Sequence, residues 1–219
     1  MSIKNNLLNI KATLPEHVTL VAVSKTKPVS DLMEAYEAGQ RIFGENKIQE
    51  MAEKWEQMPK DIQWHMIGHV QTNKVKFMAP FVSLIHGVDS LKLLHEINKQ
   101  ALKNNRIIDC LLQIYIAEEE TKFGLDEEEL ASLLSSSEFH EIKNIRIVGL
   151  MGMATFTDNK DQIKKEFLHL KTIFDTTKEL KTENCQLENI SMGMSGDYQL
   201  AIECGSTMVR IGSSIFGGR

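Results

Sequence analysis

The sequence predicts an α/β protein that folds as a single (β/α)8 barrel, and three observations carry this prediction. Apolar runs typical of buried strands alternate with helical patterns, and eight such units follow one another along the chain. The runs are apolar on both faces, as in a parallel sheet that helices cover on both sides. The glycine-rich phosphate turns G-x-G-x-x-G and G-x-x-x-x-G-K-[ST] are absent. These turns are frequent in the rival fold, an open doubly wound sheet, so a closed TIM-type barrel is favoured.

The first half of the chain contains four strand patterns, at residues 19–24, 41–44, 62–67 and 81–88. A helical pattern follows each of them, at residues 31–38, 48–55, 71–78 and 91–101, and residues 3–12 form an extra leading helix. The strand at 19–24 is β-branched and apolar throughout. The helix at 31–38 ends at Gly39. In the next helix Ile48, Met51, Ala52 and Trp55 recur at the spacing of one helical face.

The second half repeats the alternation, with strand patterns at residues 107–116, 145–153, 187–192 and 207–211. The helix at 126–134 begins with acidic residues, which suit the positive end of the helix dipole. The clearest amphipathic helix carries Ile163, Phe167, Leu170 and Phe174 on one face. A short helix at 197–204 ends at Gly205, and the last helix is missing or very short. Because no linker or composition break interrupts the pattern, we expect one domain over residues 1–219.

Composition and charge exclude several classes of function. The chain has 219 residues, a formal net charge of −5 and only 6% aromatic residues, and its basic residues form no long runs. A nucleic-acid partner is therefore not expected. No apolar stretch is long enough for a membrane span or for the core of a signal peptide. Three scattered cysteines, Cys110, Cys185 and Cys204, make neither a disulfide framework nor a metal ligand set, and they indicate a reducing cytoplasm.

Polar residues collect where the predicted strands end, which is the active-site face of a barrel. Residues 191–196 and 212–214 combine hydroxyls with glycines directly before helices. Hydroxyls and free backbone N–H groups bind phosphate, and barrels often place a phosphate after strands seven and eight. The alternative is that these segments are ordinary flexible turns, where glycine and serine are common.

Two cations stand out at the same end. Lys25 follows a buried strand, so its amine can lose solvation and act as a nucleophile for a carbonyl; the alternative is an ammonium that reaches water. Lys27 is expected on the surface. Arg210 lies in an apolar strand and needs a buried acceptor, either a ligand or a carboxylate such as Glu45 or Asp89.

The two histidines in the strands, His65 and His86, have no further ligand at metal-binding spacing. We expect them to be hydrogen-bonded core residues, so no metal site is predicted.

A lysine, a phosphate site and a buried arginine together suggest pyridoxal 5′-phosphate (PLP). The PLP aldehyde would join Lys25 as a Schiff base, with the phosphate at strands seven and eight. Arg210 would then face the pyridine nitrogen. An always-charged donor there disfavours ring protonation and weakens the electron sink, which suits racemisation-type chemistry or no chemistry.

Seven ordered segments resemble the YggS/PROSC family of pyridoxal phosphate homeostasis proteins. They are AVSKTKP (22–28), FGEN (43–46), WHMIGHVQTNK (64–74), KFGL (122–125), GLMGMA (149–154), SMGMSGD (191–197) and GSTMVRIGSSIFG (205–217). The resemblance covers nearly the whole chain. It implies a barrel like the N-terminal domain of alanine racemase, without that enzyme's second domain. It also implies a cytoplasmic, monomeric PLP-binding protein of vitamin B6 homeostasis that has no established turnover and releases PLP to apo-enzymes.

The resemblance also assigns site residues. Lys25 matches the Schiff-base lysine, and Arg210 matches the arginine that faces the pyridine nitrogen. The phosphate cradle is matched by Ser191, Met194, Ser195, Gly212 and Ser213. Asn46 matches a polar residue near the ring. Two alternatives remain: a single-domain amino-acid racemase, although none of Tyr36, Tyr115 and Tyr198 matches the racemase's second base, and a PLP-sensing module that regulates a protein partner.

Overall fold

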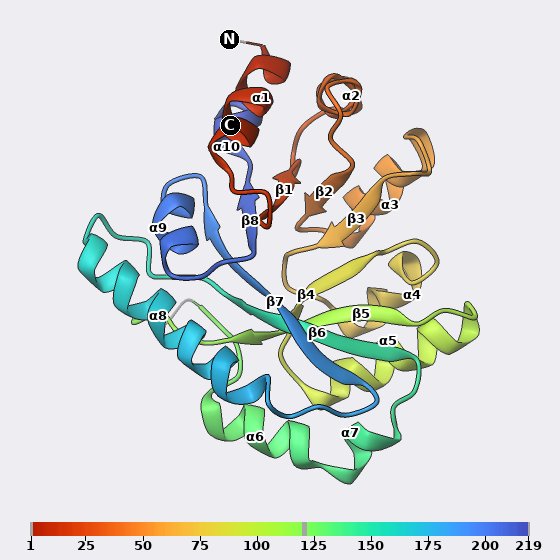
Figure 1. Ribbon diagram of the computed structural model, residues 1–219. Helices are drawn as coiled ribbons and strands as arrows, with labels where there is room; N and C mark the ends of the chain where they lie inside the picture. The colour runs from red at the N-terminus through yellow and green to blue at the C-terminus, as the bar shows by residue number, and fades with distance from the viewer. Residues whose placement is uncertain (1, 120–121, 219) are drawn as a thin grey trace.

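Eight parallel strands close into a barrel in the computed structural model of this protein, which describes residues 2–119 and 122–218 (Figure 1). The strands pair in sequence order, and β8 pairs with β1 to close the ring. Their bounds are β1 (Thr19–Val23), β2 (Ile42–Glu45), β3 (Gln63–Met66), β4 (Leu84–Val88), β5 (Ile108–Ile114), β6 (Ile145–Gly152), β7 (Cys185–Met194) and β8 (Met208–Ile211). The predicted (β/α)8 barrel is therefore confirmed. Residues 1, 120, 121 and 219 of the predicted domain lie outside the described residues.

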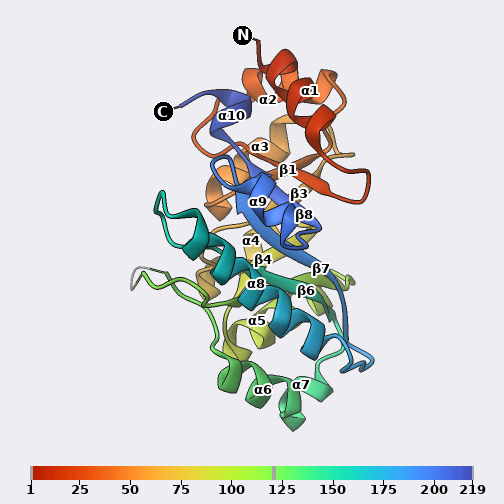
Figure 2. The same ribbon diagram turned by 60° about the vertical axis from the view of Figure 1, so that its left-hand side comes forward.

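Helices follow the strands and cover the outside of the barrel (Figure 2). They are α1 (Ile3–Thr13), α2 (Val29–Glu37), α3 (Ile48–Gln57), η1 (Thr72–Lys74), α4 (Val75–Met78), α5 (Leu91–Lys103), α6 (Glu127–Ser135), α7 (Ser137–Glu141), α8 (Lys160–Thr177), α9 (Tyr198–Glu203) and α10 (Ser213–Phe216). The two ends of the chain meet, because α1 packs against α10 and the Asn6 side chain donates a hydrogen bond to the Ile215 carbonyl (3.0 Å) (Figure 1). Among the described residues, no helix has the length and apolarity that a membrane crossing requires.

Side-chain alternation along the strands produces two apolar layers. In β1, Leu20 and Ala22 point outward and join the large core between the strands and the helices. Val21 points inward and packs with a small cluster that includes Leu111 and Met151. The interior of the barrel is thus filled at its base, and polar side chains occupy its upper part.

Four elements differ from the sequence prediction. Strand β4 starts at Leu84 rather than at 81, because the Phe81 and Val82 N–H groups donate back to the Met78 carbonyl in a turn. The helix expected over 71–78 is split into a 3-10 turn and the four-residue α4, in keeping with the low helix propensity of Thr72 and Asn73. Strand β7 starts at Cys185 rather than at 187, because its first residues alternate buried and exposed and do not form an apolar run. Helix α7 was not predicted. The last helix, α10, has four residues, as the expectation of a very short helix required.

Candidate functional site

A pocket of about 610 Å³ opens at the C-terminal ends of the strands. This volume lies within the usual range of small-molecule sites, about 300–1,000 Å³. Seven of the eight predicted site residues line it, namely Lys25, Asn46, Met194, Ser195, Arg210, Gly212 and Ser213. They come from the ends of β1, β2, β7 and β8, so closure of the barrel brings together residues from both ends of the chain. Ser191, the eighth, is not among the described residues that line the pocket.

Lys25 reaches the pocket because of its place in the strand alternation. Val21 and Val23 point into the barrel and Ser24 points toward the helices, so Lys25 is directed at the barrel mouth. Its side chain is half-buried. Among the described residues, no hydrogen bond or ion pair engages its ammonium group, so this nitrogen is available to a ligand.

Lys27 also lines the pocket, and the expectation that it lies on the surface away from the site is wrong. Residues two apart in an extended segment lie on the same face, so a continued strand would already place Lys27 on the side of Lys25. The left-handed φ of Thr26, 64°, turns the chain between the two lysines. The Lys27 ammonium donates to the carbonyl of Gly218 (2.9 Å), which ties the C-terminal segment to the rim of the pocket.

The ends of β7 and β8 form the side of the pocket at which the sequence predicts a phosphate. The Ser195 hydroxyl oxygen accepts a hydrogen bond from the Gly212 backbone N–H (3.2 Å), so the two segments are joined. A side chain at Gly193, whose φ is 99°, would lie 2.6 Å from the Ala201 Cβ. Only glycine allows β7 to turn here against α9.

Asp197 brings a carboxylate to the same wall of the pocket. It accepts a hydrogen bond from the Met194 N–H (2.6 Å). Burial raises the pKa of this carboxyl, while the bond from Met194 and the charge of Arg210 oppose that rise. The sequence pattern identified Asp197 only as the start of a helix, so its place in the pocket was missed.

Arg210 is anchored from inside the barrel. One of its terminal nitrogens donates to the Ser191 carbonyl (2.8 Å) and to the Ser191 hydroxyl (2.6 Å), and the other donates to the Gly152 carbonyl (3.1 Å). Neither Glu45 nor Asp89 pairs with it, because Glu45 points outward to α3 and Asp89 lies beside His69. The alternative of an ion pair with either of these carboxylates is therefore wrong. Burial lowers the Arg210 pKa to about 10, which leaves the guanidinium charged at neutral pH.

Ser191 lies beneath the pocket and is fully buried. Because Arg210 always donates, the Ser191 oxygen accepts that bond, and its own proton is left for His86 Nδ1 (3.0 Å). His86 Nε2 then donates to His65 Nδ1 (3.0 Å). In this structure Ser191 thus supports Arg210 and not the pocket wall, and both histidines are hydrogen-bonded core residues as expected.

Burial keeps both histidines neutral. It lowers the pKa of His65 to about 3. The pKa of His86 also falls well below its ordinary value through burial, with smaller contributions from His65 and Arg210. These hydrogen bonds link Arg210, Ser191, His86 and His65 in a row. The row therefore carries one positive charge, on Arg210 at the end that faces the pocket.

Two loops form the opposite rim of the pocket, and sequence reasoning missed their anchor. Glu166 on α8 is buried and accepts hydrogen bonds from the Thr155 N–H (2.7 Å), the Thr155 hydroxyl (2.7 Å) and the Glu118 N–H (3.2 Å). Thr155 and the exposed Phe156 line the pocket. The available signal was a glutamate within the helical stripe of Ile163, Phe167 and Leu170.

Within the part of the chain that the structure describes, no three His, Cys, Asp or Glu side chains are grouped so that they could hold a metal. The three cysteines are buried and unpaired. Burial raises the pKa of Cys185 to about 11 and raises that of Cys110 further, so neither is a thiolate at neutral pH.

Comparison with known proteins decides the family. The family model of the alanine racemase N-terminal domain matches residues 1–219. A protein of Aquifex aeolicus, named pyridoxal phosphate homeostasis protein, is 40% identical over 202 residues, which are 91% of this chain and 86% of the relative. The chain belongs to the pyridoxal phosphate homeostasis protein family. A Haemophilus influenzae protein of the same name is 39% identical over 205 residues, which are 92% of this chain and 85% of the relative.

Solved structures place the homeostasis-family barrel among known folds. PipY of Synechococcus elongatus, solved without PLP, matches with a TM-score of 0.91 at 32% identity and covers 99% of this chain and 100% of PipY. The same protein solved with PLP bound matches with a TM-score of 0.88. An alanine racemase of Clostridium difficile matches with a TM-score of 0.79 at 16% identity, which shows a shared fold. This chain spans 56% of that racemase.

Proposed function

We propose that this protein binds pyridoxal 5′-phosphate as a Schiff base on Lys25 and holds it as part of intracellular vitamin B6 homeostasis, without catalytic turnover. The observation that carries the proposal is the pocket itself. It is lined by a lysine amine that has no partner among the described residues, by serine hydroxyls with glycine backbone, and by a charged arginine. Relatives at about 40% identity are named for PLP homeostasis, and PipY has been solved with PLP bound.

Each lining residue has a role in this proposal. PLP supplies an aldehyde and an electron-accepting ring. Lys25 forms the C=N bond to the aldehyde carbon, and its two amine hydrogens leave with the carbonyl oxygen as water. Ser195, Gly212 and Ser213 bind the phosphate, with Met194 beside them. Asn46 lies near the ring, and Ser191 acts indirectly by holding Arg210.

Arg210 gives the site its chemical character. A guanidinium that is charged at neutral pH would donate to the pyridine nitrogen of bound PLP and would leave that nitrogen unprotonated. An unprotonated ring withdraws electrons poorly, which favours holding the cofactor over transforming an amino acid. We therefore propose storage and release, with apo-enzymes that need PLP as the recipients.

The test is reductive trapping. Purified protein mixed with PLP should become yellow, and borohydride followed by peptide mapping should place the label on Lys25. Lys25→Ala should lose the colour and the label, whereas the matched control Lys27→Ala, two residues further along the chain, should keep both. A wild-type protein that takes up no PLP after soaking would overturn the proposal.

Racemisation is the second candidate, because the fold is shared with alanine racemase. A two-base racemase needs a donor opposite the Schiff-base lysine. None of the three tyrosines is among the described residues that line the pocket; the Tyr36 hydroxyl bonds to Asp61 and the Tyr198 hydroxyl to Thr13. A chiral assay over a panel of amino acids decides, since turnover that Lys25→Ala abolishes would favour the racemase.

We also propose that the chain is one domain over residues 1–219, that it is monomeric, and that it acts in the cytoplasm. Light scattering at several protein concentrations tests the oligomeric state.

Transfer to a recipient is tested by mixing the PLP-loaded protein with an apo-aminotransferase and following the return of transaminase activity. If transaminase activity returns no faster than it does with free PLP released into buffer, direct delivery is contradicted.

A further inference from the structure

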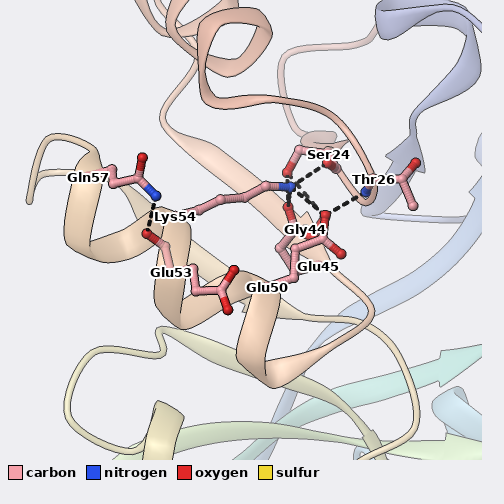
Figure 3. Close-up of polar contacts among 8 residues, drawn as sticks. All are labelled: Ser24, Thr26, Gly44, Glu45, Glu50, Glu53, Lys54 and Gln57. Atoms are coloured by element: carbon pink, nitrogen blue, oxygen red, sulfur yellow. Dashed lines mark hydrogen bonds and ion pairs between the residues drawn. The ribbon is translucent and has the colours of Figure 1, made fainter.

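A buried ion cluster lies directly behind Lys25, on the outer side of the barrel wall. Lys54 of α3 is only 5% exposed. Its ammonium donates to the Ser24 carbonyl (2.8 Å), to Glu45 Oε1 (2.7 Å) and to Glu50 Oε1 (2.8 Å). Figure 3 shows the Lys54 side chain extending from its helix into this group. An ammonium has three N–H donors, so every donor of Lys54 is used.

The cluster is separate from the pocket. Neither Lys54 nor Glu45 is among the described residues that line it. The Glu45 side chain is fully buried between β2 and α3, where Oε1 accepts bonds from Lys54 and from the Ser24 hydroxyl (2.6 Å). No partner for Oε2 is found among the described residues. Lys54 and Glu45 therefore act on a ligand in that pocket only indirectly, whereas the partly exposed Glu50 lines an adjoining pocket together with Lys25 and Asn46.

The ion cluster is connected to the pocket through the backbone on both sides of Lys25. The Ser24 carbonyl, which Lys54 binds, belongs to the peptide group that precedes Lys25. The Thr26 N–H belongs to the peptide group that follows Lys25, and it donates to Glu50 Oε1 (2.5 Å). Since Lys54 also binds that same oxygen, one ammonium–carboxylate pair holds both peptides next to Lys25 (Figure 3).

The peptide after Lys25 has a conformation that needs such support. Thr26 has a φ of 64°, and a β-branched residue rarely adopts the left-handed region. Strained conformations of this kind persist only where the surroundings impose them, and they gather at functional sites. Here the bond from the Thr26 N–H to Glu50 and the turn bond from the Lys27 N–H to the Ser24 carbonyl (3.1 Å) impose it.

Burial of a lysine between two carboxylates is a poor way to gain stability, because an apolar group of the same size often packs as well. The charged group instead fixes geometry, because one nitrogen donates three hydrogen bonds and each goes to an acceptor in a fixed position. This inference rests on the proposed function of Lys25. We propose that Lys54 is a positioning residue, which together with Glu50 fixes the backbone around Lys25 so that the Lys25 amine meets the aldehyde of PLP in a reactive orientation.

The experiment separates positioning from folding. Apo-protein is mixed with PLP, and the rate of C=N bond formation is followed by stopped-flow absorbance. Affinity for pyridoxine 5′-phosphate, which carries an alcohol in place of the aldehyde, reports the pocket without the covalent step. Lys54→Met removes the donors, Lys54→Arg restores a charged donor, and Lys92→Met on α5 is the matched control at an exposed lysine.

Lys54→Met should slow bond formation by about tenfold or more, since small misplacements of a reacting group cost such factors. Its dissociation constant for pyridoxine 5′-phosphate should stay within about threefold of the wild-type value. Lys54→Arg should recover part of the rate, and Lys92→Met should change neither quantity. Glu50→Ala, which removes the Thr26 acceptor at a partly exposed position, should slow the reaction in the same way, and it serves if Lys54→Met does not fold.

Equal rates in wild type and Lys54→Met would overturn this inference alone. So would a parallel loss of rate and of pyridoxine 5′-phosphate affinity, because that result describes a merely structural lysine. Absence of any covalent PLP in the wild type would overturn the proposed function and this inference with it.

Discussion

At the scale of single residues, the polar chain inside the barrel explains how a charge is kept at the pocket. Arg210 is buried, yet its guanidinium meets two carbonyls and one hydroxyl. The Ser191 hydroxyl donates a hydrogen bond to His86, and His86 donates one to His65. Because both histidines are neutral, neither of them adds a second positive charge beside Arg210.

The neutral state of His65 makes stability depend on pH. Burial lowers its pKa from 6.5 to about 3, so below pH 6.5 the unfolded chain binds a proton that the folded chain does not. Stability from this residue is thus complete at neutral pH and is lost as the pH falls. The loss reaches up to about 1.4 kcal/mol per pH unit. Urea unfolding at about pH 7 and about pH 5 measures it, and His65→Gln, which cannot take up a proton, should lose less stability on acidification. Equal losses in both proteins would contradict this assignment.

Residues differ in how far the sequence predicts their roles. Lys25 and Arg210 could be identified because a charged residue next to an apolar strand is conspicuous. Lys27 could have been placed at the pocket, because residues two apart in a strand share a face and Lys25 already points there. Ser191 was assigned to the pocket wall by its motif, and only the hydrogen bonds to Arg210 and His86 reveal that it stands beneath it.

At the scale of elements, Glu166 joins helix α8 to two loops at the rim. Its carboxylate accepts bonds from both the backbone and the hydroxyl of Thr155, and from the Glu118 backbone. Glu166→Gln keeps the size but replaces one acceptor oxygen with an NH2 group, which leaves a loop N–H unpaired. We expect faster amide exchange at Thr155 and Glu118 and faster release of bound PLP, with a stability loss of about 1–3 kcal/mol.

The matched control for this prediction is Glu128→Gln, at an exposed position on α6. It should change neither exchange at the rim nor PLP release. Hydrogen exchange followed by mass spectrometry reads out the loops, and absorbance after dilution reads out release. Unchanged exchange at Thr155 in Glu166→Gln would contradict a tethering role for this carboxylate.

Elements with strong periodicity were predicted within a few residues, as for β1 and for the helix that carries Ile163 and Phe167. Elements with weak local sequence patterns were predicted poorly or not at all. The 71–78 helix broke at Thr72–Lys74, and α7, which Ser136 caps through the Phe139 N–H, is only five residues long. Short elements carry too few periodic positions for a pattern to be read.

At the scale of the whole molecule, the site exists only when the barrel is closed. Lys25 follows β1 and Ser213 follows β8, and these strands pair in register from Thr19↔Met208 to Ala22↔Ile211. Helix α1 then packs on α10 behind the pocket. The number and order of the strands were predictable from the alternation of patterns, and with them the end of the barrel that bears the site. The depth of the pocket and its rim depend on contacts between segments distant in sequence, which a single sequence does not display.

Closure has a measurable consequence for stability. A ligand that binds only the folded barrel raises the free energy of unfolding by RT ln(1 + [L]/Kd), which is about 2.7 kcal/mol at a ligand concentration a hundred times Kd. Urea unfolding of the wild type with PLP should therefore show a higher midpoint at an unchanged slope, and removal of PLP by dialysis should reverse the gain. Lys25→Ala at the same PLP concentration should gain less, because it keeps the phosphate contacts but forms no C=N bond. An equal gain in both proteins would contradict a contribution of the Lys25 C=N bond to PLP binding.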